Sequence, residues 1–220
     1  MNKMLVLAAV AAFAADTPAY AAPTLTTTPG SAASFLVPAL PGMRTAVIDF
    51  NSNTLPQGFT STYTNVTRTS GTHEPFSAQP AFSDGSKYLA VLANGSALLK
   101  STSGYSVVSF YLGSIDTYNT VQILDVAGKV LNTYTGASFA TPANGNQGLP
   151  ATNRRITYQI GKGDPRIGGL RISSAQNAAE IDNVVFAVPE PSTWAMMLVG
   201  FGMMGLAMRS RQRRTSVVYA

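Results

Sequence analysis

The sequence lacks cysteine, and it contains only one histidine, His73, and one tryptophan, Trp194. Without cysteine, disulfide bonds and thiolate metal sites are excluded. A zinc site is disfavoured with a single histidine, and a Ser–His catalytic triad would have to use His73. That histidine lies between Gly71 and Pro75 in a segment with loop character, and the chain contains no G-x-S-x-G motif. We therefore expect His73 to be a solvated loop residue.

Charged residues are also scarce, at 11% of the chain, although the formal net charge is +5. Most of this excess positive charge comes from the C-terminal arginines, because residues 22–188 contain ten basic and eight acidic residues and Lys3 is balanced by Asp16. This balance gives no reason to expect a nucleic acid partner. Serine, threonine, asparagine and glycine are abundant instead. Such a composition suits an exported, β-rich protein that hydroxyl and amide groups keep soluble.

The N-terminal apolar run, Met4 to Ala15, is too short for a confident transmembrane helix, and Lys3 precedes it. Ala19-Tyr20-Ala21 then has the small-x-small pattern of a signal-peptidase site. We predict that residues 1–21 are a secretory signal peptide and that signal peptidase cleaves between Ala21 and Ala22. The alternatives are an N-terminal membrane anchor and an amphipathic helix.

Residues 22–43 are rich in Thr, Pro, Ala and Ser, and we predict a spacer that does not pack. Between residues 44 and 187, short apolar, β-branched and aromatic runs alternate with turn signals, without a long segment of helical period. Asn94-Gly95 is expected to form a type I′ hairpin. Strands are expected at residues 45–50, 87–93, 96–100, 105–112, 120–124, 129–134, 155–160, 169–172 and 180–186.

About eight to ten strands in a domain of this length are enough to bury one core. The fold class that we predict is all-β, an antiparallel β-sandwich of jelly-roll type over residues 44–187. Two long loops, 51–81 and 137–153, are expected, and binding sites commonly lie on such loops. Residues 180–186 also resemble the closing strand of carbohydrate-binding jelly rolls, in which Ile-Asp-Asn or a similar triplet precedes two apolar residues.

Asp49 and Asp182 are the candidates for a metal site, because one ends the first strong strand and the other enters the last. The first and last strands of jelly rolls often pair. Opposed carboxylates with nearby loop carbonyls would suit Ca²⁺, which prefers several oxygen ligands. The alternative is a pair of exposed or hydrogen-bonded acids at strand ends.

No catalytic residue is assigned. Paired carboxylates are the mark of glycoside hydrolysis, but acids are few here, and Asp84-Gly85 and Asp164-Pro165 are typical of turns. Among the aromatic residues, the loop residues Phe76 and Phe82 are the candidates for ligand contacts, because most others are expected in the core or on sheet faces. We therefore expect that the protein is not an enzyme. The acids considered for such a pair are Glu74, Asp84, Asp116, Asp125, Asp164, Glu180 and Asp182.

The C-terminal segment joins a stiff Pro-Glu-Pro turn, an uncharged apolar run over residues 194–208 and a cluster of arginines. At a membrane, Trp194 suits the lipid–water interface, and the arginines stop translocation and hold the tail at residues 215–220 in the cytoplasm. We predict one transmembrane helix over residues 194–208 that anchors the chain in the bilayer. As a helix it spans only about 22 Å, against a hydrocarbon core of roughly 30 Å.

Residues 188–214 resemble the PEP-CTERM sorting signal of Gram-negative bacteria. The resemblance implies recognition by exosortase, a membrane transpeptidase-like enzyme that cuts at or near the Pro-Glu-Pro and moves its substrate to the cell surface or into exopolysaccharide. The match assigns residues 189–195 to the recognition motif and the arginines to a stop-transfer cluster. The motif residues are Pro189, Glu190, Pro191, Trp194 and Ala195, and the stop-transfer residues are Arg209, Arg211, Arg213 and Arg214.

Gly200, Gly202 and Gly205 match G-x-G-x-x-G, but a dinucleotide site needs a preceding strand and a later acidic residue. Inside an apolar helix, small residues instead allow another helix to approach closely, and the processing enzyme is one such partner.

The sequence thus favours an exported surface or matrix protein whose β-domain binds polysaccharide or contributes to a biofilm without catalysis. Two alternatives stay open. One is a secreted hydrolase that acts on exopolysaccharide, and the other is a surface protein whose membrane anchor is never cut.

Overall fold

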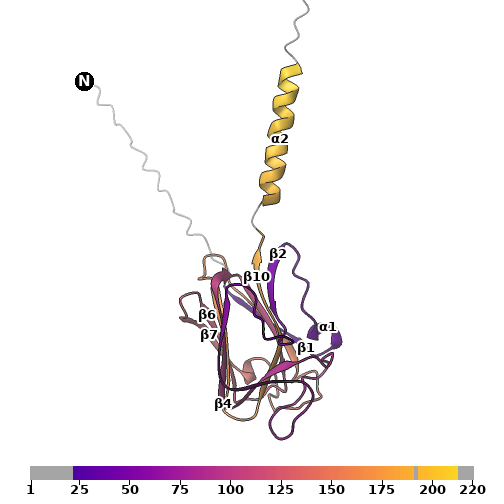
Figure 1. Ribbon diagram of the computed structural model, residues 1–220, viewed down its shortest axis with the longest axis vertical. Helices are drawn as coiled ribbons and strands as arrows, with labels where there is room; N and C mark the ends of the chain where they lie inside the picture. The colour runs from indigo at the N-terminus through magenta and orange to yellow at the C-terminus, as the bar shows by residue number, and fades with distance from the viewer. Residues whose placement is uncertain (1–21, 191–192, 213–220) are drawn as a thin grey trace, which may run out of the picture.

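The computed structural model describes residues 22–190 and 193–212, and of residues 193–195 and 210–212 it describes only the helical backbone (Figure 1). The signal peptide predicted over residues 1–21, with Ala21 at its cleavage site, lies outside the described residues. The predicted tail at residues 215–220 lies outside them as well.

The described residues form ten strands, two helices and one 3-10 turn. Each segment predicted as a strand corresponds to a strand of the structure, and two further strands, at residues 24–29 and 59–69, lie in segments predicted as a spacer and a loop. The elements are β1 (Thr24–Pro29), α1 (Ala32–Phe35), β2 (Met43–Ile48), β3 (Phe59–Thr69), β4 (Tyr88–Tyr105), β5 (Val107–Gly113), β6 (Asn119–Asp125), β7 (Val130–Thr135), η1 (Gly136–Ser138), β8 (Arg154–Gln159), β9 (Ile167–Ser174), β10 (Ala179–Pro189) and α2 (Thr193–Gln212).

The strands pair antiparallel in one continuous sheet, in the order β1-β8-β5-β10-β4-β9-β6-β7, with β2 added to β10 and β3 added to β4. Strand β10 changes partner along its length. Its first residues, 179–181, pair with β4, whereas residues 184–189 pair with β2. A strand that leaves one neighbour for another lets the sheet curl around a core (Figure 1). The prediction of an antiparallel all-β fold is confirmed.

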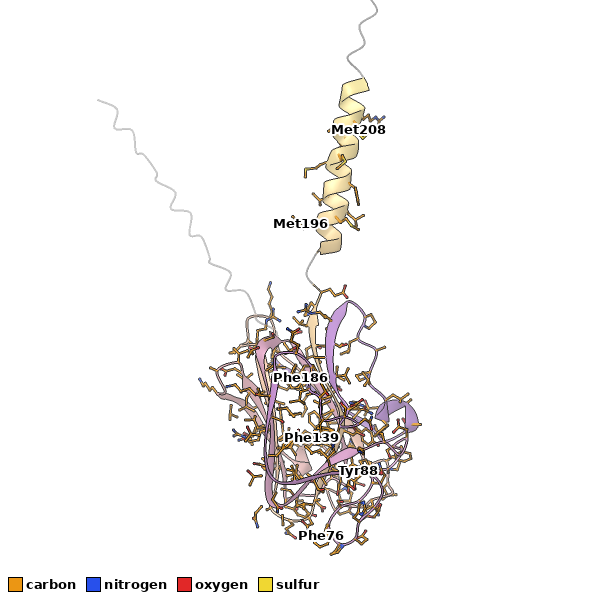
Figure 2. All side chains as sticks on the ribbon, in the orientation of Figure 1. Phe76, Tyr88, Phe139, Phe186, Met196 and Met208 are labelled. Atoms are coloured by element: carbon orange, nitrogen blue, oxygen red, sulfur yellow. The ribbon has the colours of Figure 1, made fainter. Side chains whose placement is uncertain are left out.

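The core lies inside this curl. Strand β5 is buried at every position, as expected for a near-continuous apolar run with neighbours on both faces. The ring of Phe186 packs against Phe59 and Tyr105, with centroid distances of 5.0 and 5.4 Å. Figure 2 shows Phe186, Phe139 and Tyr88 inside the domain, whereas Phe76 projects from its end.

The spacer predicted over residues 22–43 is wrong for most of its length. Strand β1 continues the sheet by pairing with β8, because its run of threonines is β-branched and suits an edge strand. Helix α1 follows, capped by the Ser31 side chain, and it buries Phe35 edge-on against the Tyr111 ring at 5.1 Å. Composition alone missed this packing because a single aromatic residue anchors the segment.

The buried guanidinium of Arg155 fastens the same segment to the sheet. It donates hydrogen bonds to the carbonyl oxygens of Ser34, Phe35, Leu36 and Asn183 at 2.5–2.9 Å. Burial lowers the pKa of Arg155 to about 10, although the nearby Asp182 opposes this change. One residue of β8 thereby donates to the carbonyls at the end of α1, where a helix leaves such groups without partners of its own, and the Asn183 amide adds a second bond to the Phe35 carbonyl at 2.9 Å.

The hairpin predicted at Asn94-Gly95 is also wrong, because β4 continues through these residues without reversing direction. Asn94 adopts a φ of 57°, and the pairing register of β3 shifts at Asn65 opposite. The Asn65 amide closes this bulge by donating to the Ala93 carbonyl at 2.8 Å. The positive φ that favours a tight turn here bends one long strand instead.

Helix α2 begins at Thr193 and continues to Gln212, so the predicted helix at residues 194–208 exists. Its residues from Met196 to Arg209 are exposed apart from Gly200, which is half-buried (Figure 2). Within residues 22–190 and 193–212, however, no helix is both long and apolar enough to cross a membrane. The prediction of a transmembrane helix is therefore not confirmed.

Candidate binding pocket and sorting motif

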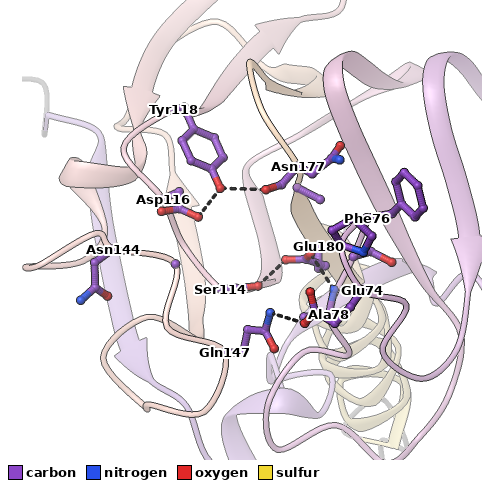
Figure 3. A pocket seen from close by; sticks show the side chains of 14 residues that line it. Glu74, Phe76, Ala78, Ser114, Asp116, Tyr118, Asn144, Gln147, Asn177 and Glu180 are labelled. Carbon is purple, nitrogen blue, oxygen red and sulfur yellow. Dashed lines mark hydrogen bonds between the residues drawn. The ribbon is translucent and has the colours of Figure 1, made fainter.

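A pocket of about 270 Å³ opens beside the start of β10, where four segments meet (Figure 3). They comprise residues 74–78, 114–118, 144–147 and 177–180. The first and third belong to the two long loops singled out from the sequence, although the first of these loops also contains β3. The antiparallel sheet brings segments that are far apart in the chain to one end of the domain.

Glu180 lines this pocket even though only 2% of its surface is exposed. The Ser114 hydroxyl donates to its Oε2 at 2.5 Å, and the Ala78 N–H donates to its Oε1 at 3.1 Å (Figure 3). Burial raises the pKa of Glu180 to about 7, and these two hydrogen bonds only partly offset that effect. Glu180 therefore exchanges its proton near neutral pH.

Asp116 is the second carboxylate of the pocket. The Tyr118 hydroxyl lies 2.5 Å from Asp116 Oδ2 and 2.9 Å from the Asn177 carbonyl oxygen, so it donates to one of them at a time. Burial raises the pKa of Asp116, while the bond from Tyr118 lowers it. The backbone approaches this carboxylate closely at Gly145, where an added Cβ would lie 2.2 Å from Asp116 Oδ2.

The outer wall of the pocket combines an acid, an amide and an aromatic ring. The Gln147 amide donates to Glu74 Oε1 at 3.0 Å, which joins the two long loops. Phe76 stands on the same wall with 56% of its surface exposed. Phe82, the other loop aromatic predicted to contact a ligand, is not among the lining residues, and its ring lies next to Gly30.

These groups give the pocket a defined chemistry. Carboxylate, amide and hydroxyl groups converge on a space large enough for one or two small rings, and an apolar ring stands beside them. Its lining residues include no Lys or Arg. The site can therefore exchange hydrogen bonds with a hydroxyl-rich ligand and stack an apolar face on Phe76, but it opposes negative charge.

His73 precedes Glu74 of this wall, but the hydrogen-bond partners of its ring lie in its own loop. Its Nε2 is 2.8 Å from Thr69 Oγ1 and 2.9 Å from the Ser70 carbonyl oxygen, and the residue is exposed. The structure thus places the single histidine in an exposed loop, as predicted from the sequence.

The two acids predicted to bind calcium lie near one another, because β2 pairs with β10 and places Asp49 beside the Asp182 segment. Asp182 is buried, accepts bonds from the Asn183 N–H and the Ser86 hydroxyl, and has its pKa raised to about 7 by burial. Asp49 is exposed and accepts a bond from the Asn51 N–H. Across the described part of the chain, no group of three or more His, Cys, Asp or Glu side chains is arranged to hold a metal ion. Calcium stays a prediction.

The other end of β10 leads into the Pro-Glu-Pro segment. Pro189 is the last residue of β10, opposite Met43, and the Glu190 N–H donates to the Gly42 carbonyl at 2.9 Å. Pro191 lies outside the described residues, and Trp194 and Ala195 belong to α2 without described side chains. The predicted stop-transfer residues are divided in the same way: Arg209 is exposed on α2, Arg211 is described only as backbone, and Arg213 and Arg214 lie outside.

Residues 187–214 match the sequence model of the PEP-CTERM protein-sorting motif. The chain carries a PEP-CTERM sorting motif. This match confirms the resemblance drawn from the Pro-Glu-Pro, the apolar run and the arginines, and it starts one residue before the predicted boundary. The PEP-CTERM motif indicates export and sorting to the cell surface by an exosortase. It covers the end of β10 and α2, so it overlaps the domain by three residues, 187–189.

No curated protein matches the chain. Solved structures with similar shapes include a family 29 carbohydrate-binding module complexed with mannohexaose, at a TM-score of 0.40 and 13% identity over 66% of this chain and 92% of that one. Another is a family 29 module complexed with cellulohexaose, at a TM-score of 0.38 and 14% identity over 67% and 93%. At this distance, shape similarity identifies neither a ligand nor a site.

The sequence named Asp116 and Glu180 as acids but did not bring them together, and it missed Ser114 and Tyr118. One signal was present. Glu180 and Asp182 interrupt an apolar strand, and acids in a strand covered on both faces must be buried. Buried acids with raised pKa values mark candidate functional sites.

Proposed function

We propose that this chain is an exported surface or matrix protein of a Gram-negative bacterium, sorted through its PEP-CTERM motif, whose β-domain binds polysaccharide. In this proposal the curled sheet is a sandwich of jelly-roll type, and exosortase separates it from α2. The ligand site is the pocket bounded by Glu74, Phe76, Asp116 and Glu180. The PEP-CTERM match supports the sorting, and the pocket supports the binding.

The observation that carries the binding proposal is an exposed aromatic ring beside convergent oxygen and amide groups. Phe76 is 56% exposed on a loop, although a residue of this size normally gains free energy by burial. A pyranose ring has an apolar face of C–H groups and a rim of hydroxyls. The apolar face can stack on Phe76, and the hydroxyls can form hydrogen bonds with Glu74, Gln147 and Asp116.

The charge of the pocket narrows the ligand class. Three carboxylates line it without a basic residue, so an anionic sugar such as a uronate would be repelled. We propose a neutral or amine-bearing polysaccharide.

The test is titration calorimetry of the mature protein, recovered from surface material, against neutral, amine-bearing and uronate oligosaccharides. Saturable binding of a neutral or amine-bearing oligosaccharide supports the proposal. Binding of uronates alone, or of none of the three, contradicts it.

One observation favours a second function, hydrolysis of exopolysaccharide. Asp116 and Glu180 share the pocket in different environments, and two carboxyl groups with separated roles are what glycoside hydrolysis requires. A reducing-sugar assay on the same oligosaccharides separates the two functions, because a binding module releases no product. Loss of product release in Glu180→Gln would then establish the enzyme.

A further inference from the structure

The end of the domain and the start of the sorting motif share a strand. Val188 and Pro189 pair with Arg44 and Met43 of β2, and the Glu190 N–H continues the ladder to the Gly42 carbonyl. The first two residues of the Pro-Glu-Pro are therefore held by main-chain pairing. Figure 1 shows β2 and β10 side by side up to the point where β10 leaves the domain.

Proline fits this position for a geometric reason. Residues of an antiparallel pair alternate between hydrogen-bonded and non-hydrogen-bonded positions. Because the Glu190 N–H donates to Gly42, Pro189 and Met43 form a non-hydrogen-bonded pair, and the missing N–H of Pro189 leaves no acceptor without a partner. The same alternation directs the Arg44 N–H toward the Val188 carbonyl.

The side chains of Pro189 and Glu190 are accessible, although the main chain of these residues is paired. Pro189 and Glu190 are exposed, so a partner can contact both side chains on the folded domain. A peptide bond inside a ladder, in contrast, is not free to enter the extended cleft in which a protease or transpeptidase holds its substrate. Access to it requires opening of the β2–β10 end.

We infer that the sorting enzyme contacts the side chains of Pro189 and Glu190 on the folded domain and cleaves C-terminal to Glu190. This inference rests on the proposed processing of the chain. In hydrolysis or transpeptidation, a peptide C–N bond breaks and its acyl carbon passes to water or to an acceptor amine. The departing nitrogen stays with the α2 fragment and takes the proton that the acceptor loses. The mature domain keeps both residues.

Pairing at this end is measured by hydrogen exchange of the full-length chain, with fragmentation that resolves single amides. We expect the Glu190 amide to exchange about tenfold or more slower than an unpaired amide. Arg44→Pro removes the N–H that faces Val188 and should abolish this protection, whereas Arg44→Ala keeps the N–H and should retain it. Unprotected exchange at Glu190 in the wild-type chain would overturn the inference.

The product is measured by mass spectrometry of the mature C-terminus after expression in a host that has an exosortase. A terminus at Glu190 or beyond supports the inference, and a terminus at Val188 or Pro189 overturns it. In Arg44→Pro we expect part of the product to end before Glu190, because the ladder no longer protects these bonds. If no product forms, the proposed sorting fails, and the exchange measurement still decides whether the two residues belong to the domain.

Discussion

The Ser114 hydroxyl donates a 2.5 Å hydrogen bond to Glu180 Oε2 at the inner wall of the pocket. Ser114 follows β5, and Glu180 is the second residue of β10, so this bond joins the ends of two neighbouring strands. Ala78 holds the other oxygen of the same carboxyl group from the long loop. A titrating group thus connects the sheet to the loop that carries Phe76.

The pH dependence of stability is the first prediction. The pKa of Glu180 is raised from 4.5 to about 7 in the folded state, so the folded protein holds a proton that the unfolded chain has lost between these values. Its contribution to stability is full below about pH 4.5 and is lost as the pH rises through 7. We expect the melting temperature to fall over this window and then to level off.

Asp182 acts in the same direction, with its pKa raised from 3.8 to about 7. Thermal unfolding of Glu180→Gln should therefore show a shallower fall than the wild type, and the double variant with Asp182→Asn should be nearly flat. A wild-type melting temperature that rises between pH 5 and 7 would contradict the assignment of both groups.

Gly145→Ala is expected to destabilise the pocket wall. Gly145 has a φ of +66°, and a Cβ there would meet Asp116 Oδ2 at 2.2 Å. Strain of this kind costs about 1–3 kcal/mol. Chemical denaturation measures the loss, and Gly148→Ala is the matched control, because its added Cβ has no neighbour nearer than 3.9 Å, Asn146 Oδ1. Equal stability of the two variants would argue against the close approach.

Arg155→Met should release α1 from the sheet. The substitution removes four hydrogen bonds and leaves the carbonyls of Ser34 and Leu36 without their side-chain donor, whereas the Phe35 carbonyl keeps the bond from the Asn183 amide; we expect a cost of about 3–5 kcal/mol. Arg171→Met is the control, since that side chain bonds the Gln122 side chain on a half-buried face. Limited proteolysis near residue 36 should increase only in Arg155→Met, and resistance to cleavage would show that the segment packs without the arginine.

Phe76→Ala should weaken oligosaccharide binding about tenfold, because a stacked ring on a loop contributes roughly 1–2 kcal/mol. Phe82→Ala removes a ring outside the pocket that is 39% exposed, less than Phe76, and should leave the affinity unchanged. Calorimetry with the same oligosaccharide compares the two. A larger loss of affinity in Phe82→Ala than in Phe76→Ala would indicate that the ligand binds near Gly30 and not in the pocket.

The sequence by itself determined eight of the ten strands that the structure describes, and it determined the sorting motif, since both depend on local patterns. Alternating apolar residues predict half-buried strands, and the Pro-Glu-Pro, apolar run and arginines lie within one short segment. Predictions from local sequence patterns were wrong where residues far away in the chain determine the local conformation. Asn94-Gly95 bends β4 because Asn65 lies opposite, and residues 24–35 pack because β8 supplies both a ladder and Arg155.

Only the tertiary structure shows which residues form the pocket and that Pro189 and Glu190 of the sorting motif continue the pairing with β2. Glu74, Asp116 and Glu180 are far apart in the chain, and only strand pairing brings their loops to one end. Glu180 and Pro189 lie near opposite ends of β10, at most about 30 Å apart at roughly 3.3 Å per residue, because the strand is irregular at Asn183. The pocket and the Pro-Glu-Pro segment therefore lie near opposite ends of one strand.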